Sequence, residues 1–357
     1  MKICYFSSYY AKDYTRTQTI LNALKKNKNF EVVECIDNSK SFLRYFKAIY
    51  KFLRLKDNFD IVVVGFRGHE ILPIIRKLTK KPIIFDAFVS VYDTLCFERK
   101  RFKPNSLIGK FLFWFDKYNC RIANKILLDT KSHADYFSKT FNLNRSKFDY
   151  DYVGANDEMF YPIKYKNNEG KFVVFFYGTY RPLQGIEYII KAAKLLEKEK
   201  DIVFKIIGGG SGYYTKSYYK KIRNLAMELN VRNVDFIDWV PYEKLPLEIA
   251  KSDVCLGGHF SNINKAKRVI SGKTFQFLAM MKPTIVGDNN ANKELFVHKK
   301  NIYMCNMADE HSLMSSILEL KRNNSLRKLL GENSYSLFLE KISSKVLEKK
   351  FKKIIRA

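Results

Sequence analysis

The sequence predicts an α/β protein made of two Rossmann-like, doubly wound domains, each built on a parallel sheet. Short apolar stretches alternate with longer segments of helical periodicity, which is typical of parallel strands with helices on both faces. This alternation runs through the first half of the chain and then repeats in the second. A length of 357 residues also favours two or three domains over a single core.

The predicted strands are short and apolar in both halves. In the first half they cover residues 2–7, 31–36, 61–65, 82–86, 125–129 and 148–153, with helical periodicity between them, for example over 17–26 and 107–123. In the second half strands are expected at 172–178, 202–208, 234–237, 254–257 and 283–287, and helices at 186–198, 217–229, 242–251 and 273–280. We therefore expect domains over residues 1–162 and 163–337, with a C-terminal helix (about 338–357) that packs back on the first domain. Two such sheets facing one another would enclose a cleft, and ligands would bind beyond the carboxyl ends of the strands.

Composition narrows the class of protein. A net charge of +28 calls for an anionic partner, although charge alone does not separate a membrane, a nucleic acid and a nucleotide substrate. A general lysine bias of the source would also explain it. The 6 cysteines form no CxxC pair, which favours reduced, buried thiols over disulfides or a zinc site. No run of about 18 apolar residues appears, and the N-terminus resembles a strand rather than a signal peptide.

The segment from Arg268 to Val286 predicts a turn, a short helix and a buried strand. Lys273 and Gln276 lie at i and i+3, so they share one face near the start of the helix. Free N–H groups, partial positive charge and a lysine together suit a phosphate, and the amide can bind sugar hydroxyls. The alternative is an ordinary crossover helix whose lysine is solvated.

Two glycine loops follow predicted strands in the second half. One begins at Gly178 and Thr179 and contains Arg181, and the other begins at Gly208. Glycine permits close backbone approach, and the helix that follows can face a diphosphate. Simple flexibility is the alternative, and neither loop matches a P-loop or a dinucleotide fingerprint.

Polar residues also follow strands in the first half. His69 and Asp86 are expected at the mouth of the cleft, where Asp86 can orient or deprotonate an acceptor hydroxyl. Arg16, after the first strand, can reach toward the diphosphate. In the structural alternative, His69 caps the next helix and Asp86 binds backbone amides in its own turn.

Residues 40–56 contain six basic residues and no acidic one. Lys40, Arg44, Lys47, Lys51 and Arg54 recur at steps of four and three, so they form one stripe of a helix. Such a helix, rich in Phe and Tyr, suits the surface of an anionic bilayer. The alternative is a crossover helix with its stripe in water and its apolar side on the sheet.

Taken in order, the motifs resemble those of family-four retaining glycosyltransferases of the GT-B fold. In the second half these are residues 177–190 (YGTYRPLQGIEYII), 204–210 (FKIIGGG), 236–246 (FIDWVPYEKLP), 252–257 (SDVCLG) and 269–283 (VISGKTFQFLAMMKP). Weaker matches in the first half are 60–69 (DIVVVGFRGH), 85–90 (FDAFVS), 126–137 (ILLDTKSHADYF) and 153–156 (VGAN).

The resemblance implies transfer of a sugar from a nucleoside-diphosphate donor, without metal or other cofactor. The diphosphate would lie near Thr179, Arg181 and Lys273. Many members carry two glutamates eight residues apart, where this chain has Arg268 and Gln276. Gln276 can still bind a hydroxyl, but Arg268 cannot accept a hydrogen bond and would contact phosphate or an acidic sugar.

The expected function is therefore that of a retaining, hexosyltransferase-type enzyme that builds a surface polysaccharide or glycoconjugate. It would act in the cytoplasm, peripherally at the inner face of the cell membrane. Its partners would be a nucleotide-sugar donor, a glycan or lipid-linked acceptor and an anionic membrane surface, with no nucleic acid. Two alternatives remain: a catalytically impaired GT-B partner subunit and a nucleic-acid-binding protein.

Overall fold

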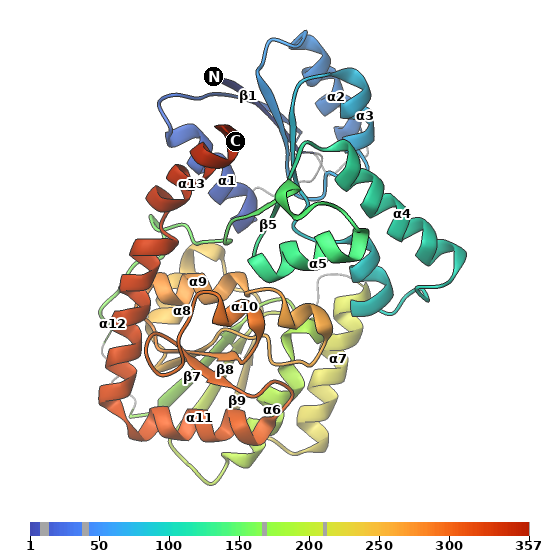
Figure 1. The fold of residues 1–357 in the computed structure, drawn as a ribbon. Coiled ribbons are helices and arrows are strands. Elements are labelled where there is room, and N and C mark those ends of the chain that lie inside the picture. The colour runs from blue at the N-terminus through green and yellow to red at the C-terminus, as the bar shows by residue number, and fades with distance from the viewer. Residues whose placement is uncertain (8–13, 38–42, 166–169, 210–212, 357) are drawn as a thin grey trace. The chain divides into compact units, whose positions relative to one another are not determined.

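A computed structural model describes residues 1–7, 14–37, 43–165, 170–209 and 213–356 (Figure 1). The chain divides into two compact units. Unit 1 comprises Met1–Gly154 together with Ser344–Ala357, and unit 2 comprises Ala155–Ser343. The chain therefore passes from one unit to the other after residues 154 and 343, whereas the sequence predicts these boundaries at 162 and about 338.

Unit 1 contains a six-stranded parallel sheet in the order β2-β1-β3-β4-β5-β6. Its strands are β1 (Lys2–Ser7), β2 (Glu31–Ile36), β3 (Ile61–Val64), β4 (Ile83–Asp86), β5 (Lys125–Leu128) and β6 (Phe148–Tyr150). Because β2 and β3 both pair with β1, the direction of winding reverses there, as in a doubly wound sheet.

Both faces of this sheet are covered. The helices are α1 (Thr15–Lys26), α2 (Arg44–Arg54), α3 (Leu72–Leu78), α4 (Leu107–Ile122), α5 (Lys131–Phe141) and α13 (Ser344–Arg356). Side chains alternate between faces along a strand: Cys4 and Phe6 join a core cluster with α2–α5. Ile3 and Tyr5 join a second cluster with α1 and α13.

Unit 2 repeats the architecture with the strand order β12-β11-β10-β7-β8-β9. The strands are β7 (Phe172–Tyr177), β8 (Ile202–Ile207), β9 (Val234–Ile237), β10 (Val254–Leu256), β11 (Thr284–Gly287) and β12 (Tyr303–Cys305). The helices are α6 (Ile186–Leu195), α7 (Tyr213–Glu228), α8 (Leu245–Ala250), α9 (Gly272–Ala279), α10 (Asn290–Lys293), α11 (Glu310–Arg322) and α12 (Asn324–Lys341).

The predicted fold class, two doubly wound parallel sheets, is confirmed. All 6 cysteines are free and buried, as expected. Within the described parts of the chain, no helix has both the length and the apolar character needed to cross a bilayer.

Candidate functional site

In unit 2, two glycines hold the loops after β7 and β8 together. The Gly178 amide donates to the Ile207 carbonyl at 3.0 Å, and the Gly208 amide donates to the Ile237 carbonyl at 2.9 Å. Gly208 has a φ of +131°, and a Cβ added to it would lie 2.2 Å from the Gly178 carbonyl oxygen. Only glycine permits this approach. The structure therefore gives Gly208 a packing role, and its contact with a ligand remains a prediction.

Lys273 lies across the backbone of the first loop, at the second residue of α9. A Cβ on Gly178 would lie 3.4 Å from Lys273 Cε and 3.6 Å from Nζ. The ammonium donates to Gln184 Oε1 at 2.6 Å and lies 4.2 Å from the centroid of the Phe176 ring. Lys273 is 6% exposed, and no carboxylate of the described residues pairs with it. Burial lowers the pKa of Lys273 to about 7.

The loop after β10 completes this corner. A Cβ on Gly258 would lie 3.2 Å from Gln184 Oε1 and 3.8 Å from Lys273 Nζ. The next residue, His259, is buried, and its Nδ1 has no hydrogen-bond partner among the described residues. Burial, followed by the charges of Lys273 and Lys265, lowers the pKa of His259 to about 3. His259 was not predicted from the sequence, although it directly follows a pair of glycines after a buried strand.

Gln276 is buried one turn further along α9. Its Nε2 donates to the Tyr242 hydroxyl at 3.0 Å, while its buried Oε1 has no hydrogen-bond partner within the described residues. An amide oxygen left in this state can accept a hydroxyl. Gln276 Oε1 is therefore available to accept the predicted hydrogen bond from a sugar hydroxyl.

The other predicted residues of unit 2 lie at the surface of the same strand ends. Arg181 is exposed, whereas Thr179 and Arg268 are half-buried. The indole of Trp239, 52% exposed, lies beside the second loop, because a Cβ on Gly209 would be 3.7 Å from its Nε1. The remainder of that glycine loop, residues 210–212, falls outside the described residues.

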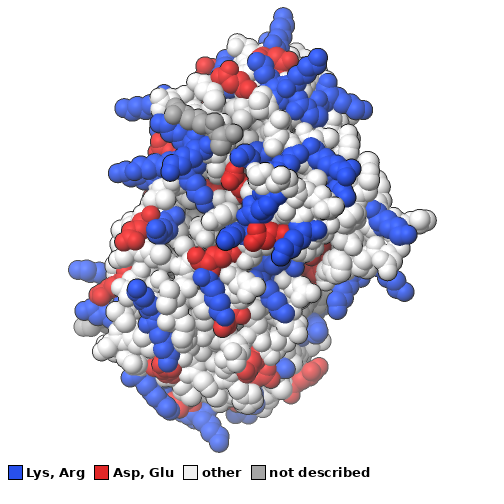
Figure 2. Space-filling view, in the orientation of Figure 1, with Lys and Arg blue, Asp and Glu red and all other residues white. Residues whose placement is uncertain are grey.

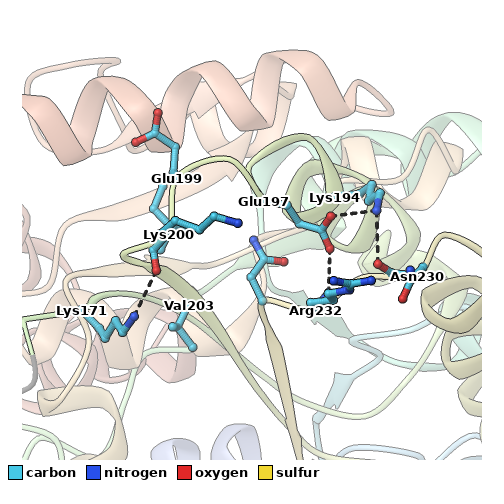
Figure 3. A pocket seen from close by; sticks show the side chains of 10 residues that line it. Lys171, Lys194, Glu197, Glu199, Lys200, Val203, Asn230 and Arg232 are labelled. Carbon is cyan, nitrogen blue, oxygen red and sulfur yellow. Dashed lines mark hydrogen bonds and ion pairs between the residues drawn. The ribbon is translucent and has the colours of Figure 1, made fainter.

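A polar hollow in unit 2 lies away from these strand ends. Figure 3 shows its lining, which includes Lys171, Glu199 and Arg232 and the first residues of β8. The hollow therefore opens at the amino edge of the sheet, opposite Gly178 and Gly208. Its lysines are largely bound to protein oxygens. Lys194 Nζ, for example, donates to Glu197 Oε2 at 2.7 Å and to the Asn230 carbonyl at 3.2 Å. The hollow is a surface ion-pair cluster rather than part of the candidate site.

In unit 1, the structure pairs two of the predicted site residues with each other. Arg16 and Asp86 are 1% and 0% exposed, and Arg16 Nη2 lies 2.9 Å from Asp86 Oδ1. Arg16 also donates to the Leu128 carbonyl at 3.1 Å and to the Asp151 carbonyl. Burial alone would lower the pKa of Arg16, but the nearby carboxylates of Asp86, Asp151 and Asp129 together outweigh burial and raise it. The guanidinium ties β4, β5 and the end of β6 together, and a contact of Arg16 with a diphosphate remains a prediction.

His69 is also buried. Its Nε2 lies 3.9 Å from Oδ1 of Asp116, and the Ser90 hydroxyl donates to Oδ2 of the same carboxylate at 2.6 Å. Burial lowers the pKa of His69 to about 4 and raises the pKa of Asp116 to about 6. Ser90 donates directly to the carboxylate, so this is not a serine–histidine–aspartate relay. His69 does not cap α3, whose N-cap residue is Ile71. The catalytic roles of His69 and Asp86 remain predictions.

Comparison with known proteins assigns the chain to a family. The family described as glycosyl transferases group 1 matches residues 157–337, which includes Gly178, Lys273 and Gln276. The chain belongs to the group 1 glycosyl transferases. The resemblance to family-four glycosyltransferases is thereby confirmed.

Relatives of this glycosyl transferase include two archaeal proteins. It is 26% identical to the uncharacterized glycosyltransferase MJ1178 of Methanocaldococcus jannaschii over 230 residues, which are 64% of this chain and 58% of that protein. It is 23% identical to the uncharacterized glycosyltransferase MJ1069 of the same organism over 331 residues, or 88% of this chain and 78% of that protein. The match thus spans little more than half of the first relative.

Solved structures show the same fold over the whole chain. Anabaena Alr3699/HepE, in complex with UDP and glucose, has a TM-score of 0.76 at 11% identity, with 100% of this chain and 99% of that chain covered. Sucrose-phosphate synthase from Thermosynechococcus elongatus has a TM-score of 0.78 at 11% identity, with 99% and 98% covered. At this identity the likeness concerns the fold, which is GT-B.

Proposed function

We propose that the protein transfers a hexose from a nucleoside-diphosphate sugar to a lipid-linked glycan, with retention of anomeric configuration and without a metal ion. The observation that carries this proposal is Lys273, a buried ammonium beside Gly178 and Gly258 that no carboxylate of the described residues neutralises. A buried charge is normally paired. Its missing partner is, in this proposal, the diphosphate of the donor.

The surroundings of Lys273 suit that ligand. Two glycine backbones leave room for phosphate oxygens to approach. Helix α9 begins at Gly272 with no side-chain cap from Ser271, so its first N–H groups add positive potential. Alr3699/HepE, which shares the fold, was solved with UDP and with UDP-glucose.

The remaining residues receive proposed roles around this diphosphate. Thr179 and Arg181 flank it from the loop after β7, and Gln276 Oε1 accepts a hydroxyl of the donor. Arg268 contacts phosphate or an acidic group of the sugar. In this proposal the leaving phosphate takes the acceptor proton, and no carboxylate of the described residues pairs with Lys273 beside it.

Calorimetry against UDP-, GDP-, ADP- and CMP-sugars tests the proposal. We expect one nucleotide class to bind and Lys273→Met to weaken that binding by about 100-fold, as expected for loss of a charge-assisted phosphate contact. Lys300→Met is the matched control, because Lys300 is an exposed lysine of the same unit. It should bind the donor like the wild type.

Three outcomes are informative beyond affinity. If no nucleotide sugar binds, the proposal fails. If a donor binds but is neither hydrolysed nor transferred, the chain is the catalytically impaired subunit considered above. If transfer occurs, the anomeric configuration of the product decides retention, and activity in EDTA decides metal independence.

A further inference from the structure

Helix α4 of unit 1 turns a second set of apolar side chains toward solvent, beside those that pack on the core. Leu107 is 87% exposed, Ile108 48%, Phe111 56% and Trp114 53%. The side that faces the core instead buries Asp116 and Asn119 along with Leu112 and Cys120. A surface helix normally keeps its outer face polar, and a contiguous exposed apolar patch marks an interaction site. We call these four exposed residues the α4 ridge.

The α4 ridge is ordered by its own ring contacts. Phe111 lies against Phe115 with centroids 6.0 Å apart and planes at 15°, and Trp114 stacks on Tyr118 at 5.1 Å and 14°. These contacts run along one helix face at spacings of four residues. The aromatic rings therefore stand on the surface as a row rather than filling a pocket.

Basic side chains surround the α4 ridge. Lys100, Arg101, Lys103 and Lys110 are exposed, whereas Asp116, the one acidic residue between positions 99 and 118, is buried. The surface is thus both apolar and strongly cationic. Its charge is complementary to an anionic layer.

Helix α2 carries the same combination. Its buried residues are Ala48 and Phe52, so one apolar side packs on the sheet as expected. A second apolar set points outward, and its members are Leu43 (57% exposed), Phe46 (60%), Tyr50 (61%) and Leu53 (51%). Lys47, Lys51 and Arg54 are exposed between them, whereas Lys40 lies outside the described residues.

Both helices lie on one side of the unit 1 sheet. Ala48 and Phe52 of α2, Ile75 of α3 and Cys120 of α4 join the same core cluster, so the outer surfaces of the three helices point away from the same sheet face. Helix α3 contributes Ile74 (42% exposed) and the exposed Lys77 to that surface. Figure 2 shows lysine and arginine side chains gathered where Figure 1 labels α2 and α3.

We infer that the outer surface of α2, α3 and α4 docks on an anionic lipid bilayer, with the α4 ridge inserted among the headgroups. Protruding aromatic and leucine side chains fit the interfacial layer of a membrane, and the interspersed lysines and arginines fit its negative surface potential. A second copy of the chain is a poorer occupant, because pairing would bring two basic surfaces together in a protein of net charge +28. The biological role of this docking rests on the proposed function, because docking would bring unit 1 to a lipid-linked acceptor.

Vesicle binding tests the inference without any donor. The wild type should co-sediment with phosphatidylcholine vesicles containing phosphatidylglycerol and far less with phosphatidylcholine alone. The triple variant Leu107→Ser, Phe111→Ser, Trp114→Ser should bind at least about tenfold more weakly, because it removes most of the inserted apolar surface. The matched control Met227→Ser, Val297→Ser, Leu329→Ser removes apolar residues of unit 2 that are 73%, 54% and 45% exposed, and it should bind normally.

Tryptophan fluorescence provides a second readout that does not depend on the folding of the triple variant. The chain has 2 tryptophans, so Trp239→Phe leaves Trp114 as the sole reporter. Its emission should shift to the blue on anionic vesicles and be quenched by brominated phospholipid. The inference is overturned if anionic vesicles do not bind, if Trp114 emission is unchanged on bound vesicles, or if sedimentation shows a dimer that the triple variant dissolves. Nucleotide binding is measured separately, so its failure would leave this result unaffected.

Discussion

The buried Lys273 ammonium donates a hydrogen bond to the neutral Gln184 amide and lies beside Gly178 and Gly258. Because no charged partner is present there among the described residues, a ligand that binds beside Lys273 will change its protonation. Burial lowers its pKa to about 7, so at neutral pH the free protein carries only part of this charge. A bound diphosphate would stabilise the protonated form and raise the pKa. Donor binding and proton uptake are therefore expected to be linked.

The first prediction concerns the pH dependence of donor affinity. Affinity should fall by roughly tenfold or more between pH 7 and pH 9, because the free protein loses the Lys273 proton in that range and the complex retains it. A nucleotide sugar suits the measurement, since its diphosphate does not titrate there. Calorimetry in buffers of different ionisation enthalpy should show proton uptake at pH 8. A slope that persists in Lys273→Met would assign the effect to another group.

The same pKa shift also affects the stability of the free protein. Unfolded lysine titrates at 10.5 and buried Lys273 at about 7, so between these values the unfolded chain holds a proton that the folded chain has lost. The Lys273 contribution to the free energy of unfolding therefore rises with pH across this window and is absent in Lys273→Met.

The second prediction separates the two roles of Asp86. Asp86→Asn removes the anion that faces the buried Arg16 guanidinium, so we expect a loss of about 3–5 kcal/mol in the free energy of unfolding of unit 1. Asp149→Asn is the control, because Asp149 pairs with Lys125 at 3.1 Å near the surface. It should cost under about 1 kcal/mol. A fully stable Asp86→Asn protein that has lost transfer activity would instead support the catalytic role that the sequence predicts for Asp86.

At the scale of elements, the site in unit 2 depends on how closely the loops after β7 and β8 approach each other. Gly178 and Gly208 are both in positive-φ conformations. The adjacent strands end side by side, with Tyr177 opposite Ile207 in the register. Gly178 thus contacts Gly208 through its carbonyl oxygen, while the position that a side chain would occupy faces Lys273.

The third prediction tests this contact. Gly208→Ala should lower the free energy of unfolding of unit 2 by about 2 kcal/mol or more, from backbone strain and from the 2.2 Å approach to the Gly178 carbonyl. Gly170→Ala is matched, because Gly170 also has a positive φ, +65°, but its added Cβ meets nothing within 4 Å. It gives the cost of a left-handed φ, about 1 kcal/mol, whereas the φ of +131° at Gly208 is less accessible to alanine and adds further strain. Equal losses in urea denaturation would mean that the close approach contributes nothing.

The sequence predicted the strands well because most are continuous buried apolar runs. It did not predict β12, α10 and α11, where residues 288–323 mix polar and apolar positions with few strong signals. The Arg16–Asp86 pair joins positions 70 residues apart, so it depends on the order of strands rather than on local spacing. For α2, periodicity identified the basic stripe but not which apolar side chains would face the sheet. The prediction of Lys273 and Gln276 on one short helix succeeded because both positions lie within two turns.

At the scale of the whole molecule, unit 1 is completed by the last segment of the chain. Phe351, Ile354 and Ile355 of α13 join the core cluster that contains Tyr5 and Leu24. Lys350 Nζ lies 3.1 Å from Asp151 Oδ1 and 4.4 Å from the centroid of the Tyr150 ring. The chain thus returns to its first unit after building the second, and unit 1 cannot form its full core until residues 344–356 are present.

The fourth prediction follows from this return. Deleting the residues after Ser343 should unfold or strongly destabilise unit 1, because one face of its sheet loses its buried cover, while unit 2 keeps all of its own strands. Calorimetric scans of the wild type should then resolve into a transition that a bound nucleotide sugar raises and one that the deletion removes.

The milder variant Phe351→Ala gives the same test without truncation. The side chain is 1% exposed, so its removal should cost about 3–5 kcal/mol and lower only the transition of unit 1. Donor binding in unit 2 should be unchanged, because Gly178, Lys273 and Gln276 all belong to that unit. If the deletion abolished nucleotide binding or shifted both transitions together, the two units would fold as one cooperative body, and the donor site would depend on a helix that shares no residue with it.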